Sequence, residues 1–296
     1  MLTRRIVLAS AALLLSVTGA PAREKLKAVA TFSILADFVK NVGGDRVDVQ
    51  ALVGPNADAH VYQPSPGDAK ALADAKVIFT NGLGFEGWIP RLIKASGTKA
   101  PMIVATKGVS PRKADDSHGH GDADPHAWQS VTNAKIYAAN IRDALLAADP
   151  AGKSAYEANA AAYLAKLDAL DAEVKAAIEK IPPDRRRIIT THDAFGYFAA
   201  SYGVAFIAPQ GVSTESEVSA RDVANIITQI KKQKIPAVFL ENITDDRLLK
   251  RIGAESGARV GGTLYSDALT DEQGPASTYI DMMRHNVKQL AQALMS

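Results

Sequence analysis

The sequence predicts an α/β protein with two similar lobes that are joined by one long helix. Apolar residues recur at steps of three and four between residues 153 and 181, and strand-helix alternation lies on both sides of this stretch. The steps indicate one apolar stripe along a helix, whereas the alternation is typical of parallel sheets covered by helices. The second half also repeats the order of the first, namely a strand, a short polar stretch, a helix, a glycine, a second strand and another glycine.

The long connecting helix is predicted within residues 149–182. Asp149 and Pro150 form a helix start signal, with Asp as the N-cap and Pro as the first helical residue, and Pro182 ends the helix. At 1.5 Å per residue it would extend roughly 40 Å, enough to reach across two lobes. Because the repeat is short and flanked by strand-helix units, a spine within a globular fold is favoured over an isolated coiled coil. The predicted stripe consists of Tyr156, Ala160, Tyr163, Leu167, Leu170, Val174 and Ile181.

The N-terminal lobe is expected to comprise residues 23–148. Ser65, Pro66 and Asp68 form a capped helix start, since Asp68 follows Ser65 by three residues. Four short strands suit one parallel sheet. The expected strands are 27–31, 47–53, 77–80 and 102–105, and the expected helices are 34–42, the one from Pro66, and one around Trp88.

The C-terminal lobe is expected to comprise residues 183–296. Ligands of open parallel sheets collect beyond the carboxyl ends of the strands, so two such lobes would face each other across a shared cleft. The expected elements are strands at 187–191, 204–208 and 237–240, helices at 194–201, 220–233 and 276–295, and a further strand-helix unit at 245–256.

Residues 1–22 have the pattern of a secretory signal peptide. Arg4 and Arg5 precede an apolar run at 6–15, and Ala20 to Ala22 forms a cleavage pattern. The run is too short to span a bilayer. The chain contains no cysteine, which excludes disulfides and the lipobox cysteine of a bacterial lipoprotein. The sequence therefore predicts an exported periplasmic protein that is not a lipoprotein.

The charge of the chain is nearly balanced. It has 34 basic and 32 acidic residues, giving a formal net charge of +2. We therefore expect no strongly positive electrostatic potential that would attract nucleic acid or anionic lipid. Nucleic-acid binding is therefore not expected.

The histidines are the clearest chemical signal. The chain has only six, and His60, His126 and His192 each fall in a loop or at a strand end. Neutral imidazole is the commonest metal ligand among side chains. Distant segments cannot be joined by spacing alone, so a metal site and scattered structural histidines both remain open on chemistry alone.

Four segments, in order, resemble the ligand segments of the zinc and manganese substrate-binding proteins of bacterial ABC importers. The resemblance covers nearly the whole mature chain and implies two four-stranded α/β lobes joined by a rigid helix. The segments are 56–66 (NADAHVYQPSP), 124–128 (DPHAW), 191–198 (THDAFGYF) and 262–269 (GTLYSDAL).

The resemblance implies that a metal ion lies between the lobes. His60 and His126 would come from the first lobe, and His192 and Asp267 from the second. Asp193 and Glu241 are reserve ligands, and they also have simpler interpretations as a helix N-cap and a strand-end charge.

Two positions depart from the family pattern. Gln129 begins a segment where the family often has Leu-Asp-Pro, although Ser130 can still cap the following helix. Ala59 stands where some zinc-specific members have a carboxylate, so the fourth ligand must come from elsewhere.

Three imidazoles and one carboxylate favour tetrahedral Zn²⁺, with Mn²⁺ as the alternative. Manganese prefers more oxygen ligands, and manganese-tuned family members typically have glutamate at the position of His192. The segment 115–124 also contains His118 and His120 among four aspartates. A loose accessory metal loop and a solvated loop are both open interpretations of this segment.

The resemblance implies that the protein captures the ion and delivers it to an ABC transporter permease and its ATPase. The protein is expected to be a monomer. Binding is expected to weaken in acid, because protons compete for the imidazoles. A zinc hydrolase is the competing class, but the sequence has no HExxH, GxSxG or P-loop motif. An adhesin-like role is a further alternative, against which the missing lipobox cysteine argues.

Overall fold

The computed structural model describes residues 24–114, 123–215 and 218–295 of the 296-residue chain. The predicted signal peptide at 1–22 lies outside the described residues. So do His118 and His120, for which an accessory metal loop and a solvated loop were both open interpretations.

The first lobe is built on a four-stranded parallel sheet in the order β2-β1-β3-β4. Its strands match the predicted ones to within a residue or so at each end. A capping box at Ser65 and Asp68 starts α2, as predicted. The strands are β1 (Leu26–Phe32), β2 (Val47–Val53), β3 (Val77–Thr80) and β4 (Met102–Val104), and the helices are α1 (Ser33–Gly43), α2 (Pro66–Asp74), α3 (Ile89–Ser96) and α4 (Val131–Ala148).

The second lobe repeats this arrangement with a parallel sheet in the order β6-β5-β7-β8. The prediction of two similar four-stranded lobes is confirmed. The bounds of β8 were not predicted from the residues, because it contains Gly261 and Gly262 and exposes Val260. The strands are β5 (Arg187–Ile189), β6 (Ala205–Ile207), β7 (Ala237–Glu241) and β8 (Arg259–Leu264), and the helices are α6 (Gly196–Tyr202), α7 (Ala220–Gln233), α8 (Arg247–Ser256) and α9 (Tyr279–Met295).

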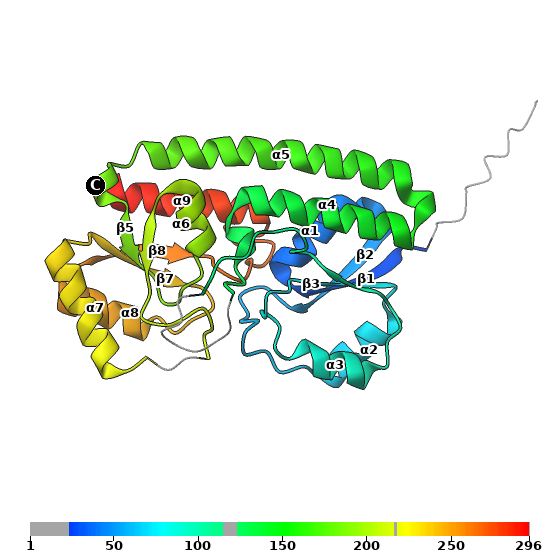
Figure 1. Ribbon diagram of the computed structural model, residues 1–296, viewed down its shortest axis with the longest axis horizontal. Coiled ribbons are helices and arrows are strands. Elements are labelled where there is room, and N and C mark those ends of the chain that lie inside the picture. Colours follow the sequence, from blue (N-terminus) through cyan, green and yellow to red (C-terminus); the bar gives the residue numbers. More distant parts are fainter. Residues whose placement is uncertain (1–23, 115–122, 216–217, 296) are drawn as a thin grey trace, which may run out of the picture.

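The long helix α5 (Lys153–Glu179) runs along one side of the molecule and spans both lobes (Figure 1). Its buried face contains the predicted stripe from Tyr156 to Val174, continued by Ile178. Ile181 is buried but lies beyond the end of the helix. The helix packs against α1, α4 and α9, so it contacts elements of both lobes.

The predicted start of this helix was wrong. A short 3-10 turn at Pro150–Gly152 precedes α5, and Gly152 is its N-cap. The Asp149 carboxylate caps no helix. It accepts hydrogen bonds from Arg46 Nη2 at 2.7 Å and from the Tyr156 hydroxyl at 2.9 Å. Both hydrogen bonds end on Oδ2, and the one from Arg46 comes from a segment 103 residues away.

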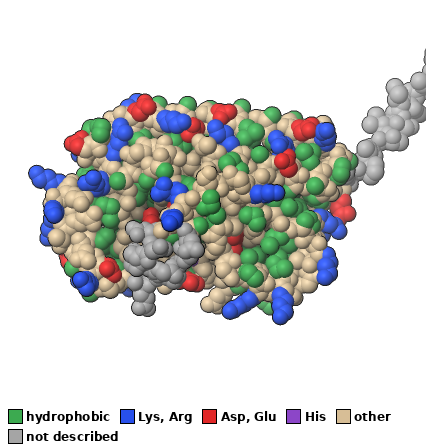
Figure 2. Space-filling view, viewed as in Figure 1, with side chains coloured by type: hydrophobic (Ala, Val, Ile, Leu, Met, Phe, Trp, Pro, Cys, Tyr) green, Lys and Arg blue, Asp and Glu red, His purple; other side chains and the backbone are tan. Residues whose placement is uncertain are grey.

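One hydrophobic core cluster runs through both lobes. Members as far apart in the chain as Phe32, Leu167 and Leu290 belong to it. The helices α1, α5 and α9 contact one another within this core. Charged side chains of both signs are scattered over the face drawn in Figure 2, in agreement with the balanced composition. The lobes are therefore joined by packing as well as by the connecting helix.

Asp37 provides a pH-dependent contact between the lobes. Its carboxylate on α1 is buried and accepts a hydrogen bond from the Tyr279 backbone N–H of α9 at 3.0 Å. Burial raises the pKa of Asp37 from the ordinary 3.8 to about 6, against the opposing effect of that N–H. The folded state therefore binds more protons than the unfolded chain between these values, and stability should fall as pH rises through them.

Asp37→Asn should remove this pH dependence while keeping an oxygen for Tyr279. Relative to the wild type, the free energy of unfolding of the variant should increase by about 2.4 kcal/mol between pH 4 and pH 7, at 1.36 kcal/mol per pKa unit. Urea titrations of metal-free protein across this range measure the difference. A difference that does not vary with pH would contradict the prediction.

Candidate metal centre

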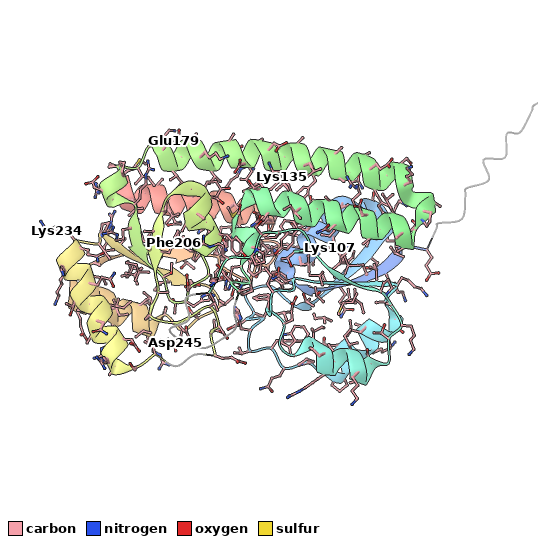
Figure 3. The ribbon with its side chains drawn as sticks, viewed as in Figure 1. Lys107, Lys135, Glu179, Phe206, Lys234 and Asp245 are labelled. Carbon is pink, nitrogen blue, oxygen red and sulfur yellow. The ribbon has the colours of Figure 1, made fainter. Side chains whose placement is uncertain are left out.

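Four side chains from the two lobes meet in the cleft between the sheets. His60 lies in the loop after β2, His126 after β4, His192 after β5, and Asp267 after β8. Their ligand atoms all lie within 4.8 Å of one another. Since the carboxyl ends of parallel strands face the cleft in both lobes, this convergence follows from the topology. Figure 3 shows the side chains of both lobes meeting in the centre of the molecule.

The four side chains are almost fully buried. His126, His192 and Asp267 have side chains with 0% exposure, and the His60 side chain is 5% exposed. No histidine of the described residues shows at the surface in the view of Figure 2. Buried ionisable groups that converge on one point are costly unless they are paired or bind an ion.

The distances around Asp267 match those of a coordination shell. Its Oδ2 lies 3.2 Å from His60 Nε2 and 3.1 Å from His192 Nε2, and its Oδ1 lies 3.6 Å from His126 Nε2. The Nε2 atoms of His60 and His126 are 3.3 Å apart. Ligands held about 2.1 Å from a tetrahedral metal ion are about 3.4 Å from one another. These distances are close to those of a zinc shell, and one ligand atom from each of the four residues lies within 4.8 Å of all the others.

Asp267 also has an unused acceptor. Its Oδ1 is buried and accepts no hydrogen bond. An unsatisfied carboxylate oxygen beside three imidazole nitrogens fits a cation better than any neutral ligand. The residues present therefore fit a divalent transition-metal ion.

A carboxylate lies behind each of two histidines. Nδ1 of His126 is 2.8 Å from Oδ1 of Asp124, and Nδ1 of His192 is 2.6 Å from Oε2 of Glu241. Such partners keep the proton on Nδ1 and leave the Nε2 lone pair for the metal. Sequence reasoning missed this role of Asp124, although Asp124 stands two residues before His126 in the DPHAW segment.

The two reserve ligands lie outside the four-residue group. Glu241 lies behind His192, and its Oε1 accepts hydrogen bonds from the backbone N–H groups of Thr191 and His192 at 2.7 and 3.0 Å. Asp193 is not a helix N-cap, because α6 begins at Gly196 with Phe195 before it. The backbone N–H of Asp193 donates to the Gly211 carbonyl at 3.1 Å.

Backbone contacts hold the loop of His60. The Asp58 carboxylate accepts from the His60 N–H at 2.8 Å, and the Trp88 indole donates to the Ala59 carbonyl at 2.8 Å. The Phe85 ring packs edge-on against His60, with ring centroids 4.8 Å apart. Ala59, one of the departures from the family pattern, is fully buried in this loop.

Asp267 is positioned by residues of the other lobe. The Trp128 indole and the Gln129 amide both donate to the Ser266 carbonyl, at 2.9 and 2.7 Å. Gln129 thus acts on the metal site even though it departs from the family pattern. Ser130 occupies the N-cap position of α4, as predicted. Its hydroxyl, however, accepts a hydrogen bond from the Ser201 hydroxyl and none from a backbone N–H of the helix.

The site is electrostatically prepared for positive charge. Burial opposes charge on His126, but Asp267 and Asp124 raise its pKa to about 9. Burial also opposes charge on His192, yet Glu241 and Asp267 raise its pKa well above the usual range. Burial lowers the pKa of His60. The pKa of Asp267 is held well below its ordinary value because the two charged imidazoles outweigh its burial.

Glu241→Gln should weaken metal binding about 10- to 100-fold, the usual cost of removing the carboxylate partner behind a metal ligand. The amide can still accept the two backbone N–H groups through its oxygen, but its NH₂ would face His192 Nδ1. That contact favours the tautomer with the proton on Nε2, which blocks the ligand atom. Competition titration with Zn²⁺ measures the loss, with surface-exposed Glu173→Gln as the matched control. Equal affinities of the two variants would refute this role.

The family model for ZnuA, zinc-uptake complex component A, periplasmic, matches residues 28–293. The chain belongs to this family. It is 37% identical over 268 residues to the iron-binding protein YfeA of Yersinia pestis, covering 90% of this chain and 86% of that protein. It is 34% identical over 277 residues to the manganese ABC transporter substrate-binding lipoprotein PsaA of Streptococcus pneumoniae, covering 92% and 89% of the two chains.

Solved structures of the family share the fold. The periplasmic zinc binding protein TroA of Treponema pallidum aligns with a TM-score of 0.85 and 29% identity, over 92% of this chain and 99% of that one. A Mn-bound periplasmic metal binding protein of Candidatus Liberibacter asiaticus aligns with a TM-score of 0.81 and 32% identity, over 91% and 100%. The predicted family and fold are confirmed.

The predicted location was wrong in excluding a lipoprotein. Family relatives named as lipoproteins include PsaA, SsaB of Streptococcus sanguinis and FimA of Streptococcus parasanguinis. The prediction relied on the absence of cysteine from the sequence alone. Across the described parts of the chain, no helix has the length and apolar character needed to cross a membrane.

Proposed function

We propose that this protein captures a divalent transition-metal ion between its lobes and delivers it to an ABC importer, made of a permease and its ATPase. The ligands are His60, His126, His192 and Asp267. The observation that supports this most strongly is the convergence of three Nε2 atoms and one carboxylate at coordination spacing. Membership of a family of import components supports the delivery step.

We propose zinc as the preferred cargo and manganese as the alternative. Three nitrogen ligands and one oxygen ligand suit tetrahedral Zn²⁺. The second oxygen of Asp267, which accepts no hydrogen bond, would provide a fifth ligand for an ion that prefers more oxygen. Relatives are named as zinc, manganese and iron proteins, so the family permits each of these ions.

Capture without catalysis is the chemistry we assign to the site. Family relatives are named as substrate-binding proteins of transporters. A catalytic zinc keeps a coordination position open for water, whereas four protein ligands fill a tetrahedral shell. We further propose lobe boundaries at 23–148 and 183–296, with 149–182 as the connector, and a monomeric state in which each chain holds its complete ligand set.

Calorimetric titration of metal-free protein with Zn²⁺ and then with Mn²⁺ tests the proposal, repeated on His192→Glu. One tight zinc site that manganese cannot occupy, with selectivity relaxed in the variant, is the expected result. Comparable tight binding of both ions would assign a mixed manganese and zinc carrier. The absence of any tight site would refute the proposed function.

A further inference from the structure

A buried carboxylate outside the ligand set lies close to the metal centre. Glu86, between β3 and α3, is only 6% exposed. Its Oε1 accepts hydrogen bonds from the Thr31 hydroxyl and the Asn81 N–H, both at 2.6 Å, and its Oε2 accepts from the Gly82 N–H at 3.2 Å. Within the described residues no lysine or arginine forms an ion pair with it. A buried carboxylate without a cationic partner is costly, and three converging donors indicate that its position matters.

The first contact route leads from Glu86 to His126. Glu86 fixes the backbone of Asn81, and the Asn81 amide donates to the Pro125 carbonyl at 2.9 Å. Pro125 is the residue directly before His126. The Asn81 side-chain oxygen accepts from the Tyr137 hydroxyl at 2.5 Å, so the orientation of the amide is set from both ends.

The second route leads from Glu86 to His60. The turn that Glu86 closes has three successive residues with positive φ, namely Gly82 at 86°, Leu83 at 56° and Gly84 at 81°. A leucine in this region is strained, and such a turn persists only where its surroundings hold it. The turn ends at Phe85, whose ring packs 4.8 Å from the His60 ring and 6.1 Å from the His126 ring.

We propose that Glu86 is a positioning residue of the metal site. It holds the turn at 81–85, so that Asn81 fixes the loop of His126 and Phe85 fixes the ring of His60. The inference rests on the proposed function, because it assigns Glu86 an effect on metal affinity. It sets the geometry of both ligands that the first lobe contributes, without any contact between Glu86 and the ion.

Glu86→Gln tests the inference with little change of shape. Its amide oxygen can still accept two donors, but its NH₂ would face the Gly82 N–H, which turns an acceptor contact into a clash of donors. Zn²⁺ affinity, measured against a chromophoric chelator, should fall about tenfold. The visible absorption spectrum of the Co²⁺-loaded protein should also change, because the ligand field reports the positions of His60 and His126.

Asp37→Asn is the matched control. Asp37 is also a buried carboxylate that accepts a backbone N–H, but it lies between α1 and α9, away from the four ligands. This variant should keep the wild-type Zn²⁺ affinity and Co²⁺ spectrum. If Glu86→Gln matches the control in both readouts, the inference is overturned. If the wild-type protein itself binds no Zn²⁺, the proposed function fails, which is a different result.

If Glu86→Gln does not fold, Tyr137→Phe provides a second test of whether the turn at 81–85 positions the metal ligands. It removes only the hydroxyl that orients Asn81, and it touches none of the four ligands. We expect a loss of Zn²⁺ affinity of about threefold, corresponding to part of one hydrogen bond, together with a shifted Co²⁺ spectrum. Wild-type affinity and an unchanged spectrum in this variant would overturn the inference.

Discussion

Asp267→Ala should lower the affinity for Zn²⁺ at least about a hundredfold, or about 2.7 kcal/mol of binding free energy. Asp267 is the only carboxylate in the ligand group, and its Oδ2 lies within 3.2 Å of the Nε2 atoms of His60 and His192. Its removal takes away one ligand and also the negative charge at the centre of three imidazoles. Calorimetric titration of metal-free protein with Zn²⁺ measures the effect.

Two further variants separate the causes. Asp267→Asn keeps an oxygen and the shape but removes the charge, and we expect an intermediate loss. Asp271→Ala, four residues further along the chain at an exposed position, should bind Zn²⁺ as the wild type does. Wild-type affinity in Asp267→Ala would show that the ion is held elsewhere.

Trp128→Ala should lower the free energy of unfolding by about 3–5 kcal/mol, the usual cost of truncating a large buried aromatic side chain. Trp128 is fully buried, and its ring centroid lies 5.0 Å from those of both Phe32 and Phe85. Its indole N–H donates to the Ser266 carbonyl of the opposite lobe at 2.9 Å. Urea denaturation of metal-free protein measures the loss.

The same substitution should also weaken Zn²⁺ binding, because Ser266 directly precedes Asp267. Trp128→Phe provides the control, since it keeps an aromatic ring in the core and removes the indole donor. We expect it to lose less stability than Trp128→Ala, while Gln129 still holds the Ser266 carbonyl at 2.7 Å. A loss of stability below about 1 kcal/mol in Trp128→Ala would contradict the account of a core shared by both lobes.

Much of the fold could be predicted where local pattern and tertiary packing agree. The bounds of β2, β3 and α7 match the prediction in full, since each is an apolar or amphipathic run with clear stop signals. Predictions failed for two reasons. Asp149 has the features of an N-cap, but its side chain binds Arg46 from a distant part of the chain. The strand β8 was not predicted because it contains two glycines in place of an apolar run.

The site could be predicted only in part. Chemistry alone left scattered histidines and a metal site both open, and the choice of Asp267 came from the resemblance of its segment. The structure brings these four side chains together, and their role as ligands stays a proposal. Glu241 could not be assigned to Nδ1 of His192 from spacing, because that contact depends on how two distant strands are arranged in three dimensions. The contact of Asp124 with Nδ1 of His126 is local, two residues apart, and was missed although the spacing allows it.

The most direct test is an anomalous diffraction experiment on crystals of the zinc-loaded protein, recorded on both sides of the zinc absorption edge. The account predicts one strong peak between the lobes, about 2.0–2.1 Å from the Nε2 atoms of His60, His126 and His192 and about 2.0–2.2 Å from an oxygen of Asp267. A peak at any other place, or a zinc ion bound by fewer of these residues with water at an open position, would contradict it.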